Sequence, residues 1–166
     1  KKMIGGIEGW KDEGFRLDGG GGRLSVRKTE CDGNVPVTAD DLRPPVLDTF
    51  TLRGNPFALE AFFNGRRSLG QWDYASDFDN SWTDSAAVDA HVHAGWTYDY
   101  LFKRFGRHGL DDRGLPILNI VHPVSRSDMA RYFDEFSDLF VNAFYAGDGV
   151  MVYGEGIPAT LTLDGQ

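Results

Sequence analysis

The sequence predicts an α+β domain, built mainly of antiparallel β-strands and loops with one long central helix. Residues 86–105 carry apolar side chains at steps of three and four, which is the spacing of one helix face. Several shorter apolar runs are separated by turn signals, which is typical of strands and hairpins. The 21 glycines and 7 prolines among 166 residues exceed the average share of turn-forming residues, so we expect many loops.

Composition and charge exclude several classes of protein. With 41% hydrophobic residues, the chain can bury a core of one-domain size. The formal net charge of -8 would repel a phosphate backbone, so we expect no nucleic-acid partner. No apolar stretch is long enough for a membrane span, and the first residues lack the apolar core of a signal peptide. We therefore expect no membrane partner and a chain that is soluble or already processed.

Residues 1–45 predict irregular strand and loop, because glycines and prolines interrupt every apolar run. The run Gly19–Gly22 resembles a phosphate-binding loop but lacks the required Lys-Ser or Lys-Thr ending, so we expect a flexible turn. The single cysteine, Cys31, cannot form an internal disulfide. In an extracellular protein, bound cations would be the usual substitute.

Three segments predict strands and hairpins. The apolar runs 46–52 and 57–63 flank the turn signal Arg-Gly-Asn-Pro, so we expect a β-hairpin there. Residues 117–121 have the composition of a buried strand. The runs 140–145 and 150–154 flank an Asp-Gly pair, which is a strong signal for a second hairpin.

Two segments predict helices. The helix over 86–105 is preceded by the capping residues 83–85 and has a basic last turn followed by Gly106. A second amphipathic stretch begins at Ser127, a suitable N-cap, and continues to Phe140.

The loop Asp77-Phe78-Asp79-Asn80-Ser81 carries two carboxylates at alternate positions. If the backbone curls around a hard cation, both carboxylates can bind it. The segment begins like an EF-hand loop but departs from that motif, because its sixth position is Trp82 and its twelfth is Val88. From these residues alone, a calcium site and a solvated turn before a helix both stay open.

The histidines do not predict a metal site. His91 and His93 lie two positions apart on the predicted helix, so their side chains point about 200° apart and cannot share one ion. His108 and His122 are isolated in the sequence. We expect structural roles for all of them.

Residues 141–145, Val-Asn-Ala-Phe-Tyr, place an amide side chain beside two aromatic ones on a predicted strand. An open edge strand can pair with an extended peptide, and an asparagine at its end can hydrogen-bond the amides of that peptide. A strand buried in the core is the simpler alternative, and the residues alone leave both open.

Several segments, in the same order, resemble the thermolysin-family zinc metalloendopeptidases. Residues 88–100 (VDAHVHAGWTYDY) resemble the long helix in the N-terminal half of those enzymes. Residues 142–145 (NAFY) resemble their substrate-binding strand, and 151–156 (MVYGEG) resemble the hairpin strand after it. Residues 76–80 fall in register with a calcium loop of the family. The resemblance covers about residues 68–156 and implies a thermolysin-like N-terminal lobe.

The resemblance implies a calcium site. Family members bind calcium through carboxylates at the positions that match Asp77 and Asp79, and through a backbone carbonyl at the position that matches Ser81. We therefore expect calcium to be bound there.

The resemblance also implies a substrate-binding site. The residue that matches Asn142 hydrogen-bonds the substrate backbone, and the residue that matches Ala143 does so through its main-chain carbonyl. The residues that match Phe144 and Tyr145 line side-chain pockets. A substrate would then lie extended and antiparallel to residues 142–145.

The sequence departs from the family at the catalytic centre. H-E-x-x-H, which places two zinc ligands one helical turn apart beside a general base, is absent. The third zinc ligand and the histidine that stabilises the transition state, which follow that motif in the family, are absent too. We expect no catalytic residue in this chain and no hydrolysis by it alone. Zinc would be bound by a C-terminal lobe or a second chain carrying H-E-x-x-H, so the end at Gln166 is interpreted as a nick, a split or an excision.

We expect residues 1–166 to form one N-terminal β-rich lobe of a metalloprotease catalytic domain. Residues 1–45 match the family poorly, and the segment between His122 and Asn142 is longer than the family's connection. The helical residues 124–141 are therefore interpreted as an insertion. It would form a flap or wall over the cleft, or a decoration packed only against the surface.

The function that the resemblance implies is the substrate-binding lobe of a secreted, thermolysin-like zinc metalloendopeptidase acting on peptide or protein substrates. The alternative is a non-catalytic, calcium-stabilised β module that binds peptides or inhibits a protease. A second polypeptide bearing H-E-x-x-H would distinguish the two hypotheses.

Overall fold

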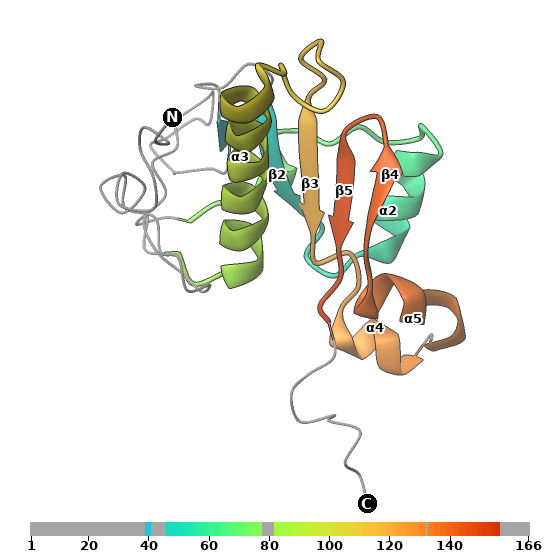
Figure 1. The fold of residues 1–166 in the computed structure, drawn as a ribbon. Coiled ribbons are helices and arrows are strands. Elements are labelled where there is room, and N and C mark those ends of the chain that lie inside the picture. The colour runs from blue at the N-terminus through green and yellow to red at the C-terminus, as the bar shows by residue number, and fades with distance from the viewer. Residues whose placement is uncertain (1–38, 41–45, 78–81, 132, 157–166) are drawn as a thin grey trace, which may run out of the picture.

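The computed structural model describes residues 39–40, 46–77, 82–131 and 133–156. Within these ranges the chain forms a five-stranded sheet flanked by helices (Figure 1). The strands are β1 (Ala39–Asp40), β2 (Leu47–Thr51), β3 (Ile117–Val121), β4 (Ala143–Gly147) and β5 (Val150–Tyr153). The helices are α2 (Pro56–Phe63), α3 (Ser85–Phe105), α4 (Arg126–Arg131) and α5 (Phe133–Val141), with the short 3₁₀ helix η1 (Gln71–Asp73). The predictions for residues 1–38 and 41–45 lie outside the described residues.

The sheet is mixed, with the strand order β1-β2-β3-β5-β4. The inner pairs β2–β3 and β3–β5 are parallel, whereas the outer pairs β1–β2 and β4–β5 are antiparallel. Parallel neighbours need a long crossover, and helices lie in the chain both between β2 and β3 and between β3 and β5. The α+β class is confirmed. The expectation of mainly antiparallel strands is not confirmed, because two of the four described strand pairs are parallel, and hairpin signals carry no information about the order of the inner strands.

Helix α3 corresponds to the long helix predicted over 86–105. Asp84 caps its first turn, because the Asp84 side chain accepts a hydrogen bond from the Ala87 N–H (3.0 Å). Its buried face packs against β2 and β3, with Ala94 and Tyr98 meeting Ile117 in one core cluster. The shorter helices α2, α4 and α5 accompany α3, so the expectation of a single helix among strands and loops is incomplete.

The segment 57–63, predicted as the second strand of a hairpin, is helix α2. Asn55 is its N-cap and accepts a hydrogen bond from the Ala58 N–H (3.1 Å), while Pro56 occupies the first turn. The Asn-Pro pair that suggests a turn therefore starts a helix. The first strand of that predicted hairpin is correct and corresponds to β2.

The second predicted helix is confirmed as helical but is divided into α4 and α5 on either side of residue 132, which lies outside the described residues. Helix α5 continues to Val141. The first strand of the second predicted hairpin therefore begins at Ala143 and not at residue 140.

The turn of that hairpin is as predicted. Asp148 and Gly149 have φ angles of 47° and 81°, and the two-residue hairpin turn favoured by Asp-Gly requires positive φ at both positions. The predicted buried strand over residues 117–121 is also confirmed, as β3.

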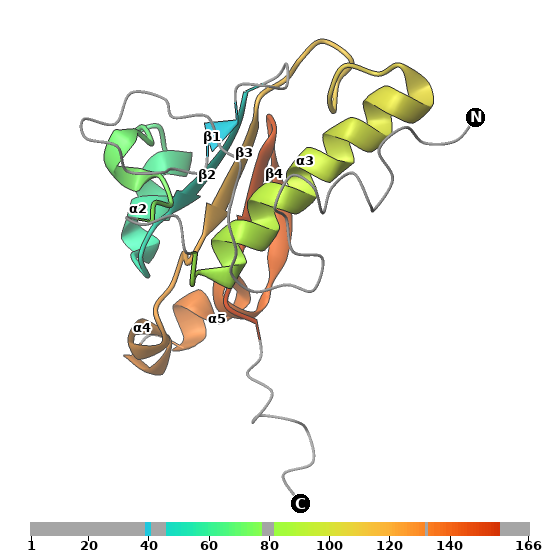
Figure 2. The ribbon, with the colours of Figure 1, turned by 90° about the vertical axis from the view of Figure 1, so that its left-hand side faces the viewer.

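Helices α2 and α3 cover opposite faces of the sheet (Figure 2). On the α2 face, Ile120 of β3 and Val152 of β5 share a core cluster with Leu59 of α2. On the α3 face, Val121 of β3 belongs to a cluster with Ala90 of the helix. Alternate side chains of β3 therefore build two separate cores.

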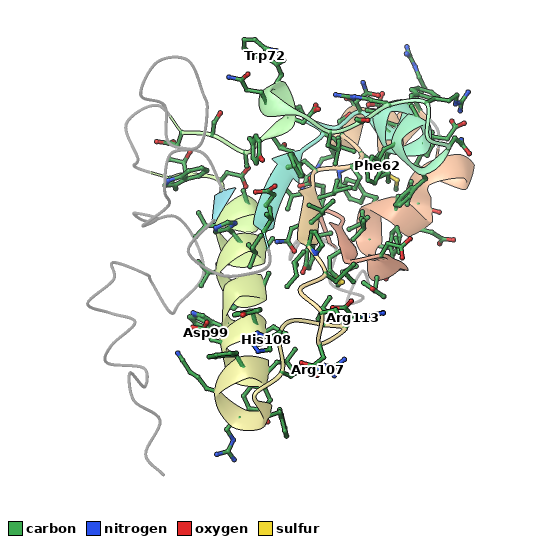
Figure 3. The ribbon with its side chains drawn as sticks, turned by 90° about the horizontal axis from the view of Figure 1, so that it is seen from above. Phe62, Trp72, Asp99, Arg107, His108 and Arg113 are labelled. Atoms are coloured by element: carbon green, nitrogen blue, oxygen red, sulfur yellow. The ribbon has the colours of Figure 1, made fainter. Side chains whose placement is uncertain are left out.

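The view along the sheet in Figure 3 separates the α2 side, marked by Phe62, from the α3 side, marked by Asp99.

None of the helices in the described ranges is both long and apolar enough to cross a membrane.

Candidate functional site

Strand β4 is an edge strand. It pairs with β5, and in the described part of the chain no strand pairs with its other side. Asn142, Ala143 and Tyr145 are exposed, Tyr145 to 53%. The alternative of a core strand is therefore wrong, and this stretch of backbone has an open side.

The backbone of β4 directs hydrogen-bonding groups toward that open side. The carbonyl of Asn142 accepts a hydrogen bond from the Gly154 N–H (2.8 Å), so the main-chain groups of Asn142 point toward the β5 side. Because successive residues of a strand point their N–H and C=O groups in opposite directions, Ala143 directs its own pair toward the open edge. Tyr145, two residues further and in register with Met151, does the same.

The side chain of Asn142 covers one of these edge groups. Its Oδ1 accepts a hydrogen bond from the Ala143 N–H (2.9 Å). The Ala143 carbonyl keeps its outward direction. An arriving peptide can therefore meet this carbonyl directly and can reach the N–H only after the Asn142 side chain turns away.

The aromatic side chains of β4 point to opposite faces of the sheet. Phe144 is half-buried and packs against the core cluster on the α2 face, together with Val152. Tyr145 lies on the α3 face, and its hydroxyl oxygen accepts a hydrogen bond from the Gly149 N–H (3.1 Å). Of the two predicted pocket residues, Tyr145 lines a cavity, whereas Phe144 packs against a core cluster.

That cavity has a volume of about 430 Å³ and lies between α3 and the sheet. Tyr145 and Met151 line it from the edge of the sheet, Asn119 from β3, and His93 and Thr97 from α3. It therefore adjoins the open strand on the face that α2 does not cover.

Asn119 places a buried amide at the cavity. Its Nδ2 donates a hydrogen bond to Thr49 Oγ1 (3.2 Å), and Thr49 Oγ1 also meets Nδ1 of the buried His91 (3.1 Å). The Asn119 Oδ1 has no hydrogen-bond partner among the described residues. A buried acceptor without a partner is energetically unfavourable, so a ligand in the cavity that donates a hydrogen bond to Asn119 Oδ1 would be stabilised.

The two histidines of α3 have different surroundings. His91 is buried against Thr49 of the sheet, whereas His93 is exposed at the cavity and meets Trp96 edge-to-face. Because they lie two residues apart on α3, the two side chains leave the helix in different directions.

His122, which is isolated in the sequence, joins two carboxylates from distant segments. Its Nε2 lies 3.0 Å from each carboxylate oxygen of Asp84, the N-cap of α3. Its Nδ1 contacts Glu155 Oε1, just after β5. The cluster therefore ties the start of α3 to the carboxyl ends of β3 and β5.

Charge in this cluster stabilises the protonated imidazole. The hydrogen bond with Asp84 raises the pKa of His122 from 6.5 to about 9, against the effect of burial, and the hydrogen bond with Glu155 contributes. Burial would raise the pKa of Asp84, but the hydrogen bonds from His122 and Ala87 lower it below its usual value. At neutral pH both ring nitrogens of His122 are donors. Local spacing carries no signal for this cluster, because its members are 33 and 38 residues apart.

The predicted calcium ligands are only partly described. Asp77 is half-exposed and precedes α3, whereas Asp79 and Ser81 lie outside the described residues. In the parts of the chain that the structure describes, no group of three or more His, Cys, Asp or Glu side chains could hold a metal. The described residues therefore do not fit a zinc centre.

Comparison with known proteins points to one family. The family model for the thermolysin metallopeptidase catalytic domain matches residues 39–164. The chain is 34% identical to a bacillolysin of Brevibacillus brevis over 129 residues, which are 78% of this chain and 20% of that protein. It is 37% identical to a bacillolysin of Bacillus cereus over 91 residues, which are 55% of this chain and 14% of that protein.

Among solved structures, the precursor of protealysin, a metalloproteinase from Serratia proteamaculans, matches with a TM-score of 0.44 and 24% sequence identity. The match covers 81% of this chain and 31% of that one. The chain spans about a fifth or less of the length of the bacillolysins above.

Proposed function

This chain belongs to the thermolysin metallopeptidase family, and from that premise we propose that it forms one wall of the substrate cleft of a zinc metalloendopeptidase. An extended peptide would lie along β4. The bond to be cleaved would face residues from another part of the protein. The peptide or protein substrate and a zinc-bearing lobe or second chain are the partners in this proposal.

The observation that carries the proposal is the open edge of β4. Ala143 and Tyr145 direct main-chain groups toward that edge, and no described strand uses them. A guest strand can pair with such groups without any rearrangement of the sheet. Main-chain pairing is indifferent to the guest's sequence, which suits an enzyme that acts on many peptides.

In this proposal, Asn142 sets the register of the guest. Its side chain already occupies the Ala143 N–H (2.9 Å), so it lies at the point where the pairing begins. When a peptide carbonyl takes over the Ala143 N–H, the Asn142 amide is released to bond the peptide backbone. The substrate therefore replaces a hydrogen bond within the protein and adds new ones.

The aromatic ring of Tyr145 would supply apolar contact. It is 53% exposed and lies beside the cavity of about 430 Å³ on the α3 face. Phe144 would act less directly, because it packs into the core on the α2 face.

The zinc of this proposal would not be held by the residues described above. They do not fit a zinc centre, and H-E-x-x-H is absent from the 166 residues. The contribution of this chain is to bind and orient the peptide, and we assign it no proton transfer. Hydrolysis by this chain alone is not expected.

We also propose that Asp77, Asp79 and the Ser81 carbonyl bind calcium, and that the protein is secreted. A chelator should then lower the melting temperature of the protein, because calcium binds only the folded state. The double variant Asp77→Asn with Asp79→Asn should melt at the same temperature with and without chelator. An unchanged chelator response in the double variant would remove this site.

The decisive experiment for the substrate strand is Asn142→Ala in the complete enzyme, assayed with a quenched fluorescent peptide. We expect kcat/KM to fall by roughly tenfold, which corresponds to the loss of one or two hydrogen bonds. Asn64→Ala, an exposed asparagine at the end of α2, serves as the control and should leave kcat/KM unchanged. Equal kcat/KM in wild type and Asn142→Ala would refute the proposal.

A non-catalytic peptide-binding module is the second candidate, because H-E-x-x-H is absent from the 166 residues. Calcium would stabilise such a module, and β4 would bind peptides or block a protease. Co-purification with a polypeptide that bears H-E-x-x-H would favour the enzyme. Tight peptide binding by the chain in the absence of any such polypeptide would favour the module.

A further inference from the structure

Helices α4 and α5, which are interpreted from the sequence as an insertion, are anchored where that segment begins. The Ser125 N–H donates a hydrogen bond to the Gly54 carbonyl (3.3 Å), in the turn that leads into α2. The Ser125 hydroxyl accepts a hydrogen bond from the Asp128 N–H (3.0 Å), so it caps α4. The start of the insertion is therefore attached to a segment about seventy residues earlier in the chain.

The middle of this segment, at the start of α5, packs against α2. The rings of Phe136 on α5 and Phe57 on α2 meet edge-to-face, with their centroids 5.8 Å apart and an interplanar angle of 89°. Leu139, one turn further along α5, packs against the core cluster on the α2 face of the sheet. Helix α5 is thus seated against the folded core and does not project over the α3 face, where the cavity lies.

The end of α5 is attached to the segment that follows β5. The Gly156 N–H donates to the Phe140 carbonyl (3.0 Å), which satisfies a carbonyl of the last helical turn. A Cβ atom at residue 154 would lie 2.3 Å from the carbonyl oxygens of both Leu139 and Phe140, so only glycine allows this approach. The two backbones are in contact here.

Asn142 is the only residue between this anchored helix and β4. Its carbonyl accepts the Gly154 N–H (2.8 Å), and its side chain covers the Ala143 N–H. An edge strand is held by a neighbouring strand on one side only, so the position of its first residue also depends on the chain segment before it. Here that segment comprises α4 and α5 and is attached to the rest of the fold at its start, its middle and its end.

We propose that α4 and α5 are a brace that holds Asn142 in its substrate-binding position, and that Phe136 is a positioning residue for Asn142. This inference rests on the proposed function, because it requires Asn142 to contact the substrate. The insertion is then neither a flap nor a decoration. Its contact with α2 is transmitted through the rigid helix α5 to the first residue of the strand.

The proposal predicts a particular kinetic effect. Phe136→Ala removes the aromatic contact and leaves the substrate-binding groups in place, so KM should rise by roughly two- to tenfold, the range that loss of one aromatic pair allows. The value of kcat should change less, because the lost interaction affects binding in the ground state and the transition state alike. Phe136→Leu, which keeps an apolar side chain, should restore most of the affinity.

The test is a double-mutant cycle in the complete enzyme with a quenched fluorescent peptide. KM and kcat are measured for wild type, Phe136→Ala, Asn142→Ala and the double variant, below the melting temperature of each. If Phe136 acts through Asn142, the double variant has the KM of Asn142→Ala alone. Phe57→Ala, on the other side of the contact, should reproduce the effect of Phe136→Ala and serves if the latter does not fold.

Phe105→Ala is the matched control. Phe105 forms a similar edge-to-face pair with Tyr100 (5.7 Å, 78°) at the far end of α3, so its loss should leave KM unchanged. Multiplicative effects of Phe136→Ala and Asn142→Ala, or an unchanged KM in both Phe136→Ala and Phe57→Ala, would overturn the brace while the proposed function stands. An unchanged KM and kcat in Asn142→Ala would overturn both.

Discussion

The inner strands and the open edge of the sheet use their backbones in different ways. Strand β3 is paired on both sides, by β2 and β5, and its residues Ile120 and Val121 are completely buried. Strand β4 is paired with β5, and its residues Ala143 and Tyr145 are exposed. The inner strand uses its hydrogen bonds on both sides to build the fold, whereas the outer side of β4 carries main-chain groups that no described strand uses and that we propose a peptide pairs with. Substitutions in β3 should therefore change stability, and substitutions in β4 should change binding.

The first test of this comparison, with the largest expected change in stability, is a substitution at Ile120. Ile120→Ala removes a side chain that is fully buried between β3 and α2, so the free energy of unfolding should fall by about 2–5 kcal/mol. Urea unfolding measures it. Val46→Ala, at a residue that is 48% exposed, is the control and should change stability by about 0.5 kcal/mol or less. A similar decrease in the free energy of unfolding in both variants would show that stability does not depend on the burial of the substituted residue.

The next effect concerns His122, at the point where β3 leaves the interior. The folded state raises its pKa from 6.5 to about 9, so its contribution to stability is complete below pH 6.5 and is lost as the pH rises through 9. With allowance for solvent screening, this contribution is on the order of 2 kcal/mol. Urea unfolding at a series of pH values should show the decline in wild type.

The variant His122→Gln sharpens that measurement. It lacks the titrating group, so its free energy of unfolding should be lower at pH 6 and should lose the decline that wild type shows toward pH 9. His108→Gln, at an exposed histidine outside the cluster, should retain the decline. Parallel pH profiles for wild type and His122→Gln would show that the cluster does not stabilise the fold.

The smallest effect is expected at the open edge itself. Tyr145→Phe removes only the hydroxyl that accepts a hydrogen bond from the Gly149 N–H (3.1 Å), so the free energy of unfolding should fall by about 0.5–1 kcal/mol. The ring remains, so KM for a peptide should not change. Thermal unfolding and steady-state kinetics of the complete enzyme check the two parts. A raised KM would show that the hydroxyl itself contacts the substrate.

Much of the local structure follows from the sequence because its signals are local. The periodic apolar residues of α3, the apolar run of β3 and the Asp-Gly turn each carry their own pattern. The prediction of a strand over 57–63, where α2 lies, is wrong because Asn55-Pro56 is both a turn signal and a helix start. In the structure the Ala58 N–H donates a hydrogen bond to the Asn55 side chain, and residues 56–63 continue as a helix.

The non-local features could not be predicted in the same way. The parallel inner pairs depend on strand order, and the contact of His122 with Asp84 and Glu155 joins segments that share no motif. The resemblance to a family predicts a substrate strand at residues 142–145, but only the sheet order shows that this strand lies at an edge of the described sheet. The opposite orientations of Phe144 and Tyr145 follow from strand alternation once the faces are known.

The position of β5 between β3 and β4 has a consequence for folding. Strands β4 and β5 form a local hairpin, which can close within microseconds, whereas the docking of β5 on β3 must first close a loop that contains α4, α5 and β4. Until that docking occurs, the hairpin exposes the unpaired edges of both β4 and β5, instead of that of β4 alone. A peptide added early in refolding could then capture β5 and keep the hairpin away from the sheet. A good ligand of the finished protein is therefore expected to slow its refolding.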